Sequence, residues 1–192
     1  MAPGFRETAT VRVENEAKLM NATRILISQH RAIESLFAEV ARVTRPQLRA
    51  RAASRLTEEL IAHMAGEEAI FYPAARRALG RLAAHGEGGI DDHFMLRAQL
   101  RRFVATNVRE PSFQPRFEAL RLLFTRHVQD EESELFPRVD ATLARAQLDA
   151  LGAKVLGARP PIWVVTGDQD DLVYPDMASA ALGVRLPSLS HN

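Results

Sequence analysis

The feature that most constrains this chain is an eleven-residue pattern that occurs twice. Residues 63–73 read HMAGEEAIFYP and residues 127–137 read HVQDEESELFP, so both follow His-x-x-x-Glu-Glu-x-x-apolar-aromatic-Pro. Positions four apart lie one above the other on the same face of an α-helix. Each copy therefore presents one imidazole and one carboxylate in the same direction. These side chains are His63 and Glu67 in the first copy, and His127 and Glu131 in the second.

A further histidine precedes each copy of the pattern. His93 follows His30 by 63 residues, and His127 follows His63 by 64 residues. This near-equality predicts two similar helical hairpins, each with a histidine on its first arm and a His/Glu pair on its second. At about 1.5 Å per residue, the four histidines lie at similar distances from their hairpin turns. Packing of the hairpins into a four-helix bundle would bring all four imidazoles to one level of the core.

The composition favours an all-α fold and excludes several kinds of site. Ala, Leu, Arg and Glu dominate the 192 residues, and all four are good helix formers. The chain has no cysteine, which excludes disulfides, thiolate metal sites and thiol nucleophiles. Its formal net charge of +1 and the mixing of arginine with glutamate argue against nucleic acid as a partner. No apolar stretch is long enough to span a membrane, and the first twenty residues lack a secretory signal, so we expect a soluble cytoplasmic protein.

Apolar stripes at helical spacing divide the chain into an up-down four-helix bundle with additions at both ends. We expect a flexible N-terminal tail over 1–17, the bundle over 18–150, and a C-terminal helix end with an extended tail over 151–192. The breaks fall at Thr44–Pro46, in a glycine-rich loop from Gly80 to Asp92, and at Glu110–Ser112, with a short extra helix over 145–156. Pro73 is expected to kink or stop the second helix, because proline lacks a backbone donor.

The histidines and glutamates on the core-facing stripes require an explanation. Burying charge is strongly unfavourable unless the charge is paired or bound to a metal. Apart from Arg97, the core faces offer no cationic partner for Glu67 and Glu131. A metal centre removes the difficulty, since imidazole nitrogens and carboxylate oxygens bind metal ions whose charge compensates the acids.

The order His, His-x-x-x-Glu, His, His-x-x-x-Glu, with Tyr-Pro or Phe-Pro after each pair, resembles the hemerythrin-like HHE cation-binding domain. The resemblance covers roughly residues 20–150 and implies a four-helix bundle with a non-haem di-iron centre. It implies two iron ions with an oxo or hydroxo bridge. The implied terminal ligands are His30, His63, His93 and His127, and the implied bridging carboxylates are Glu67 and Glu131. Ferritin-like bundles instead use Glu-x-x-His with more carboxylates, a pattern that is not found here.

The sequence departs from the oxygen-carrying hemerythrins in one position. Those proteins have a second histidine one turn along the third helix, whereas Gly89 and Arg97 stand one turn either side of His93. One metal ion would therefore have an open position, or would be completed by Glu34, Glu68 or water. This difference argues against reversible oxygen storage. Four residues are candidates for an additional ligand or for contacts to the ligands: Glu34, Glu68, Tyr72 and Arg97.

We therefore expect a non-haem di-iron protein that binds or reduces a small oxidant, O₂, H₂O₂ or NO, in detoxification or in a redox or iron response. Turnover stays open, with peroxidase-like, catalase-like or NO-reducing activity as the enzymatic versions. Two alternatives remain: a sensor or regulatory module without turnover, and a bundle that holds structural zinc or manganese. The expected partner is a small diatomic or peroxide ligand, and a homodimer or a protein partner bound through the C-terminal tail stays open.

Overall fold

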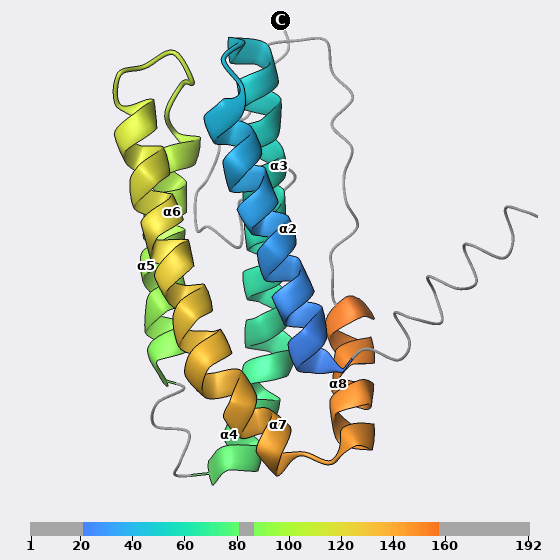
Figure 1. The fold of residues 1–192 in the computed structure, drawn as a ribbon. Coiled ribbons are helices and arrows are strands. Elements are labelled where there is room, and N and C mark those ends of the chain that lie inside the picture. The colour runs from blue at the N-terminus through green and yellow to red at the C-terminus, as the bar shows by residue number, and fades with distance from the viewer. Residues whose placement is uncertain (1–20, 81–86, 158–192) are drawn as a thin grey trace, which may run out of the picture.

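The structure is a computed structural model that describes residues 21–80 and 87–157 (Figure 1), and every element in these ranges is helical. In chain order the elements are α2 (Ala22–Arg42), α3 (Pro46–Gly66), the π-helical turn η1 (Glu67–Phe71), α4 (Tyr72–Leu79), α5 (Glu87–Val104), α6 (Phe113–Asp130), the π-helical turn η3 (Glu131–Leu135), α7 (Phe136–Thr142) and α8 (Arg145–Gly157).

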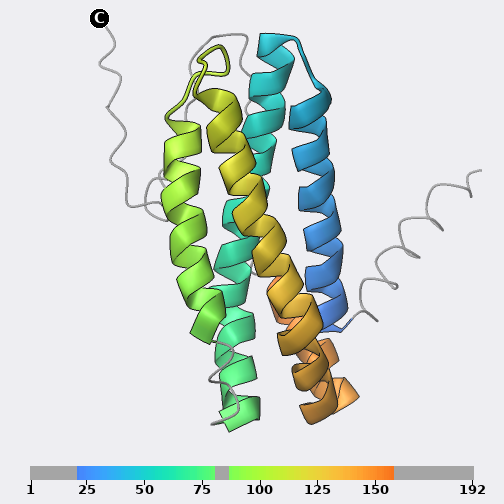
Figure 2. The ribbon, with the colours of Figure 1, turned by 60° about the vertical axis from the view of Figure 1, so that its left-hand side comes forward.

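Helices α2 and α3 form one antiparallel hairpin and α5 and α6 form the other (Figures 1 and 2). The α2–α3 and α5–α6 connections lie at the same end of the molecule, and α4 and α7 lie at the opposite end. The predicted up-down four-helix bundle is thus confirmed, as is the extra helix, observed as α8. Within the described ranges, no helix combines the length and apolar character needed to cross a membrane.

Local sequence explains where the first hairpin begins and turns. Asn21 caps α2, because its side-chain oxygen accepts a hydrogen bond from the backbone N–H of Arg24 at 2.9 Å. Helix α3 starts at Pro46, in the first turn where the missing N–H of proline costs nothing. The predicted break at Thr44–Pro46 therefore coincides with the observed turn.

The expectation that Pro73 would kink or stop the second helix is wrong as to the stop, because helical structure continues past this proline. The kink stays a prediction. The chain widens into η1, in which the N–H of Tyr72 bonds to the carbonyl of Glu67, and continues as α4 with Pro73 in its first turn. The second repeat has the same construction, because the N–H of Phe136 bonds to the carbonyl of Glu131. Glu67 and Glu131, the first glutamate of each copy of the motif, thus each begin a π-helical turn. Such turns are frequent at functional sites.

The third helix begins earlier than the sequence predicts. We expected a loop to Asp92, but α5 already includes residues 87–92. His93 therefore lies in the second turn of α5 and is fully buried, rather than at a helix end.

The apolar core is divided into two clusters by a layer of polar side chains. One cluster extends from that layer towards the hairpin turns and includes Phe37, Phe117 and Phe124. The other surrounds η1 and η3 and includes Phe71 and Phe136 together with residues of α8. Four histidines and two glutamates form the polar layer between the clusters, and at most 3% of each residue is exposed: His30, His63, Glu67, His93, His127 and Glu131. Burying these side chains so completely is unfavourable in free energy unless their charges are paired or compensated by an ion.

Candidate metal centre

The four predicted histidines meet inside the bundle at one level, as the equal spacing implied. Their ring centroids lie 4.7 Å apart for His30 and His63, and 4.8 Å apart for His93 and His127. His30 and His63 are each 5.9 Å from His127. The imidazoles thus form two close pairs, and each pair belongs to one hairpin.

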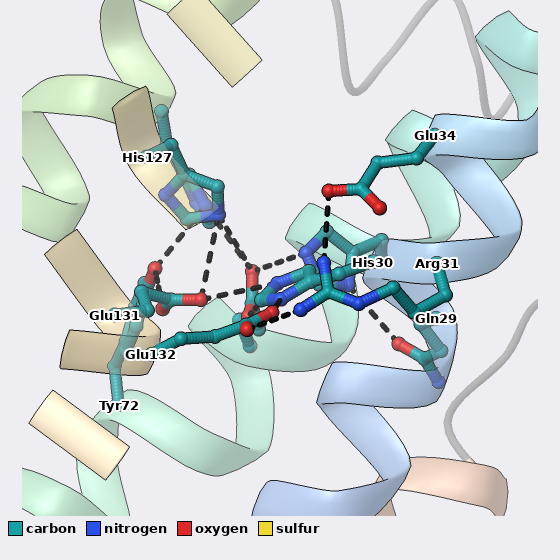
Figure 3. Close-up of polar contacts among 11 residues, drawn as sticks. Gln29, His30, Arg31, Glu34, Tyr72, His127, Glu131 and Glu132 are labelled. Atoms are coloured by element: carbon teal, nitrogen blue, oxygen red, sulfur yellow. Dashed lines mark hydrogen bonds and ion pairs between the residues drawn. The ribbon is translucent and has the colours of Figure 1, made fainter. Parts of the chain in front are cut away.

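Glu67 lies at the centre of this cluster. Its Oε2 is 3.2 Å from Nε2 of His63, 3.2 Å from Nε2 of His93 and 3.7 Å from Nε2 of His127. Oε2 of Glu131 is 3.3 Å from Nε2 of His30 and 3.5 Å from Nε2 of His127. Both carboxylates therefore touch imidazoles from both hairpins, as Figure 3 shows for Glu131 with His30 and His127.

Most of the atoms that point into the cluster have no hydrogen-bond partner among the described residues. These buried atoms are Nε2 of His30, His63 and His127, both carboxylate oxygens of Glu67, and Oε2 of Glu131. Such atoms are rare in folded proteins because their desolvation is uncompensated. Two ligand atoms about 2.1 Å from one ion, at neighbouring coordination positions, lie about 3 Å apart. The observed separations of 3.2–3.7 Å therefore suit atoms arranged around cations.

The chemical identity of the candidate ligand atoms also suits a metal site. Candidate ligand atoms of His30, His63, Glu67, His127 and Glu131 all lie within 4.8 Å of one another, and His93 adjoins them through Glu67. Imidazole and carboxylate together suit iron, zinc and manganese. The six residues named from the sequence are thus brought together in a layer whose chemistry fits metal ions.

Two glutamates outside the layer fix the orientation of the first-arm histidines. Oε1 of Glu68 is 2.7 Å from Nδ1 of His93, and Oε1 of Glu132 is 2.8 Å from Nδ1 of His30. Each glutamate follows the buried glutamate of its own hairpin and reaches the histidine of the other hairpin. Metal-binding histidines commonly have such carboxylate partners on the second ring nitrogen, which set the tautomer and ring orientation.

Arginines at the surface complete both of these contacts. Arg97 pairs with Glu68, and Arg31 pairs with Glu132, as Figure 3 shows for Arg31. Arg97 was expected as a partner for one of the two buried carboxylates, but in the structure it pairs with Glu68 instead. The repeat thus gives two similar chains of contacts, from a surface guanidinium through a carboxylate to a buried imidazole.

The remaining predicted residues take different places. Glu34 is 46% exposed and pairs with Arg31, so in this structure it lies outside the layer. Tyr72 is buried, and its hydroxyl donates to Oε1 of Glu131 at 2.8 Å and lies 3.2 Å from Nε2 of His93. Sequence reasoning missed Gln29, whose Oε1 is 3.0 Å from Nδ1 of His63.

Burial and mutual contact shift the acidity of the layer. Burial and the neighbouring Glu131 raise the pKa of Glu67 well above its usual value. Burial would raise the pKa of Glu131 as well, but His127 and His30 outweigh it and lower that pKa to about 2. Burial lowers the pKa of His127 to about 4, so this imidazole is neutral, the form that binds metal. Burial opposes the charged form of His30, but its contact with Glu131 and the charge of Glu67 raise its pKa.

A comparison with protein families identifies the domain that contains the polar layer. The model of the hemerythrin HHE cation binding domain matches residues 21–139, which include every residue of the layer. The chain belongs to this hemerythrin HHE family. Helix α8 lies beyond the matched residues.

One solved structure agrees in fold, and one further protein is similar in sequence. The crystal structure of a hemerythrin HHE cation binding domain-containing protein from Mycobacterium kansasii aligns with a TM-score of 0.62 and 24% identity. The alignment covers 72% of this chain and 84% of that chain. A DNA nickase from Nostoc sp. PCC 7120 is 25% identical over 154 residues, which are 78% of this chain and 42% of the nickase. This HHE chain thus spans less than half the length of that relative.

The glutamates that contact the histidines give a first prediction. Glu68→Gln and Glu132→Gln are expected to weaken metal affinity about 10- to 100-fold, because each removes the negative charge behind an imidazole. Competition against a chelator of known affinity measures the effect. Glu134→Gln is the matched control, since Glu134 is exposed and, among the residues that the structure describes, pairs only with Arg138. Equal affinities in all three variants would contradict an orienting role.

Proposed function

We propose that the polar layer binds two iron ions and that the loaded protein binds or reduces a small oxidant, O₂, H₂O₂ or NO. The observation that carries the proposal is the set of buried inward-facing nitrogens and oxygens without hydrogen-bond partners. Membership of a cation-binding family supports it. In this proposal His30 and His63 hold one ion and His93 and His127 hold the other, since each pair shares a hairpin and a short ring separation.

Glu67 and Glu131 take the position between the two ions. Their oxygens approach imidazoles of both pairs, which supports a bridging role for both carboxylates. Their negative charge offsets that of the cations in a site with little access to water. Bound iron would supply a Lewis acid and electrons for the oxidant.

The protein makes the two halves of the site different. Tyr72 places a hydroxyl beside His93, whereas the corresponding Phe136 stacks on His30 with ring centroids 5.8 Å apart. The Tyr72 hydroxyl has one proton to donate, which orients Glu131 here and could instead be donated to a ligand on the His93 side. Burial and the charges of Glu67 and Glu131 raise the pKa of Tyr72 well above its usual value, so it stays a donor at neutral pH. Phe124 and Phe136 limit the access of water on the His30 side.

Metal uptake is expected to strengthen as the pH rises. The raised pKa of Glu67 means that the metal-free chain holds a proton there, which the cation must displace. Affinity should therefore increase about tenfold per pH unit while that proton is displaced, and level off once the pH exceeds the Glu67 pKa. Chelator competition across pH 5–9 measures the slope. In Glu67→Gln no proton leaves this position, so metal affinity should rise less steeply with pH. An unchanged slope of affinity against pH would show that the displaced proton does not come from Glu67.

The oxidant chemistry is tested with iron-loaded protein. Peroxide consumption and NO binding are measured for the native chain, for Glu131→Ala and for Glu34→Ala. The proposal predicts that Glu131→Ala loses both reactions and that Glu34→Ala keeps them, because Glu34 is exposed and outside the layer. A fully iron-loaded native chain that neither consumes peroxide nor binds NO or O₂ would refute the function and leave the metal site standing.

A sensor without turnover is the second candidate, and the position of α8 favours it. This helix packs against α2, which carries His30, and against η1, which begins at Glu67. Metal binding that changes η1 could therefore change the docking of α8. Hydrogen exchange of α8 with and without iron tests this; the sensor predicts protection that depends on metal, with no consumption of oxidant.

Other expectations keep the status of predictions. Structural zinc or manganese remains the alternative to iron, and analysis of the bound metal decides between them. A cytoplasmic location and a homodimer or tail-bound partner are untested. DNA nicking is not proposed for the polar layer, because residues so deeply buried are out of reach of a phosphate backbone.

A further inference from the structure

The fold gathers positive charge at the end of the bundle that carries the hairpin turns. Residues 42–51, at the α2–α3 connection, contain four arginines and no acidic residue. Residues 101–116, at the α5–α6 connection, contain four arginines and one glutamate. These two segments, here called the basic end, hold seven more positive than negative charges in a chain whose formal net charge is +1. Figures 1 and 2 place both connections at the same end.

Several of these arginines are free to bind an anionic partner. Five are exposed, and their guanidinium groups form no hydrogen bond or ion pair with any residue in the described ranges. They are Arg42, Arg45, Arg51, Arg102 and Arg109. Arg42 and Arg102 lie in the last turns of α2 and α5, where they also complement the helix dipoles. Arg45, Arg51 and Arg109 have no such explanation, and an excess of like charge is unfavourable without a counter-charge.

The chain itself contains the complementary charge. Residues 160–184 carry four aspartates and no lysine or arginine. Three of them, Asp168, Asp170 and Asp171, fall within four positions. This acidic segment follows α8 and lies outside the described residues.

The connection from α8 is long enough to reach the basic end. Val155 lies next to Gly66: a Cβ added to Gly66 would be 4.0 Å from Cγ1 of Val155. The 21 residues of α3 separate Gly66 from the basic end at Pro46, which is about 30 Å of helix. The eleven residues from Gly157 to Asp168 span up to about 36 Å when extended. A tether of this length also gives the segment a high effective concentration at the surface.

We propose that the acidic segment around Asp168–Asp171 docks on the basic end of the same chain and occupies its unpaired arginines. Arginine suits this contact because its planar guanidinium pairs with carboxylates in bidentate geometry. Docking connects the bundle end that carries the turns with α8, which packs against α2 and η1. Outside polyanions then compete with the acidic segment for the same arginines.

Fluorescence energy transfer tests the docking, because the chain has one tryptophan, Trp163, and no cysteine. An acceptor dye is attached at Thr44→Cys, an exposed position between α2 and α3. Docking predicts strong transfer from Trp163 at 0.01 M salt and at least about a twofold loss at 1 M salt, where the screening length falls from about 30 Å to about 3 Å. An acceptor at Ala141→Cys, exposed on α7 at the opposite end, should show no salt-dependent loss.

The decisive variant replaces Asp168, Asp170 and Asp171 by asparagine in the full chain. Docking predicts that, at low salt, energy transfer from Trp163 to the acceptor at Thr44→Cys is as weak in this variant as it is in the native chain at high salt. It also predicts that this variant binds a short DNA duplex, used as a polyanion probe, more tightly than the native chain. Unchanged transfer, or equal DNA affinity of the two chains, would overturn the proposal and leave the basic end as a surface for an outside partner.

Discussion

Replacing Glu67 by alanine is expected to abolish retention of metal. Glu67 is fully buried, and its Oε2 lies within 3.7 Å of nitrogens from three histidines, more than any other carboxylate oxygen of the layer. Its loss removes a ligand shared by both proposed ions and leaves their charge uncompensated. Since removing an outer contact costs about 10- to 100-fold in affinity, losing this ligand should cost more than about 100-fold. Elemental analysis after gel filtration measures the loss.

The chain supplies a matched control in Glu34→Ala. Glu34 follows His30 by four residues, as Glu67 follows His63, but it lies at the surface with Arg31. This variant should retain the native metal content. Equal retention in Glu67→Ala and Glu34→Ala would show that the metal, if any, is bound elsewhere.

Metal is also expected to stabilise the fold strongly. The proposed ligands come from four helices, so the site exists only in the folded chain and binding would shift the equilibrium towards it. At a free metal concentration a thousandfold above the dissociation constant, the free energy of unfolding should rise by about 4 kcal/mol. Urea denaturation with and without ferrous iron, under anaerobic conditions, measures the gain.

The same experiment on Glu67→Ala gives the contrast. At the same iron concentration, its gain should fall below about 1.4 kcal/mol, because affinity is reduced more than a hundredfold. Metal-free Glu67→Ala should nevertheless fold, since the change removes a buried carboxyl group that has no hydrogen-bond partner. A full gain in this variant would locate the stabilising metal outside the layer.

The polar layer was predictable because its spacing is a property of the helix. The four-residue interval between His63 and Glu67 fixes their common face, and its recurrence at His127 and Glu131 fixes the second hairpin. The same spacing made Glu34, four residues after His30, a candidate for an additional ligand, but Glu34 lies at the surface in this structure. Glu34 lies at the edge of the buried face of α2, where pairing with Arg31 in solvent is cheaper than burial.

Other features depend on how the helices approach one another. The pairing of Arg97 with Glu68, and the contact of Gln29 with His63, join residues from different helices, so no periodicity within one helix reveals them. The π-helical turns were also not predicted. A helix of regular 3.6-residue period turns about 100° between Phe71 and Tyr72, but after the widened turn both are buried in the apolar cluster around η1 and η3.

The most direct measurement of the central claim is the metal content of the native chain, purified without chelator and examined by native mass spectrometry and optical absorption. The proposal predicts two iron ions per chain and an absorption band from an oxo or hydroxo bridge. It also predicts loss of both ions in Glu67→Ala. A native chain that carries no transition metal, and takes up neither iron, zinc nor manganese when they are offered, would contradict the account.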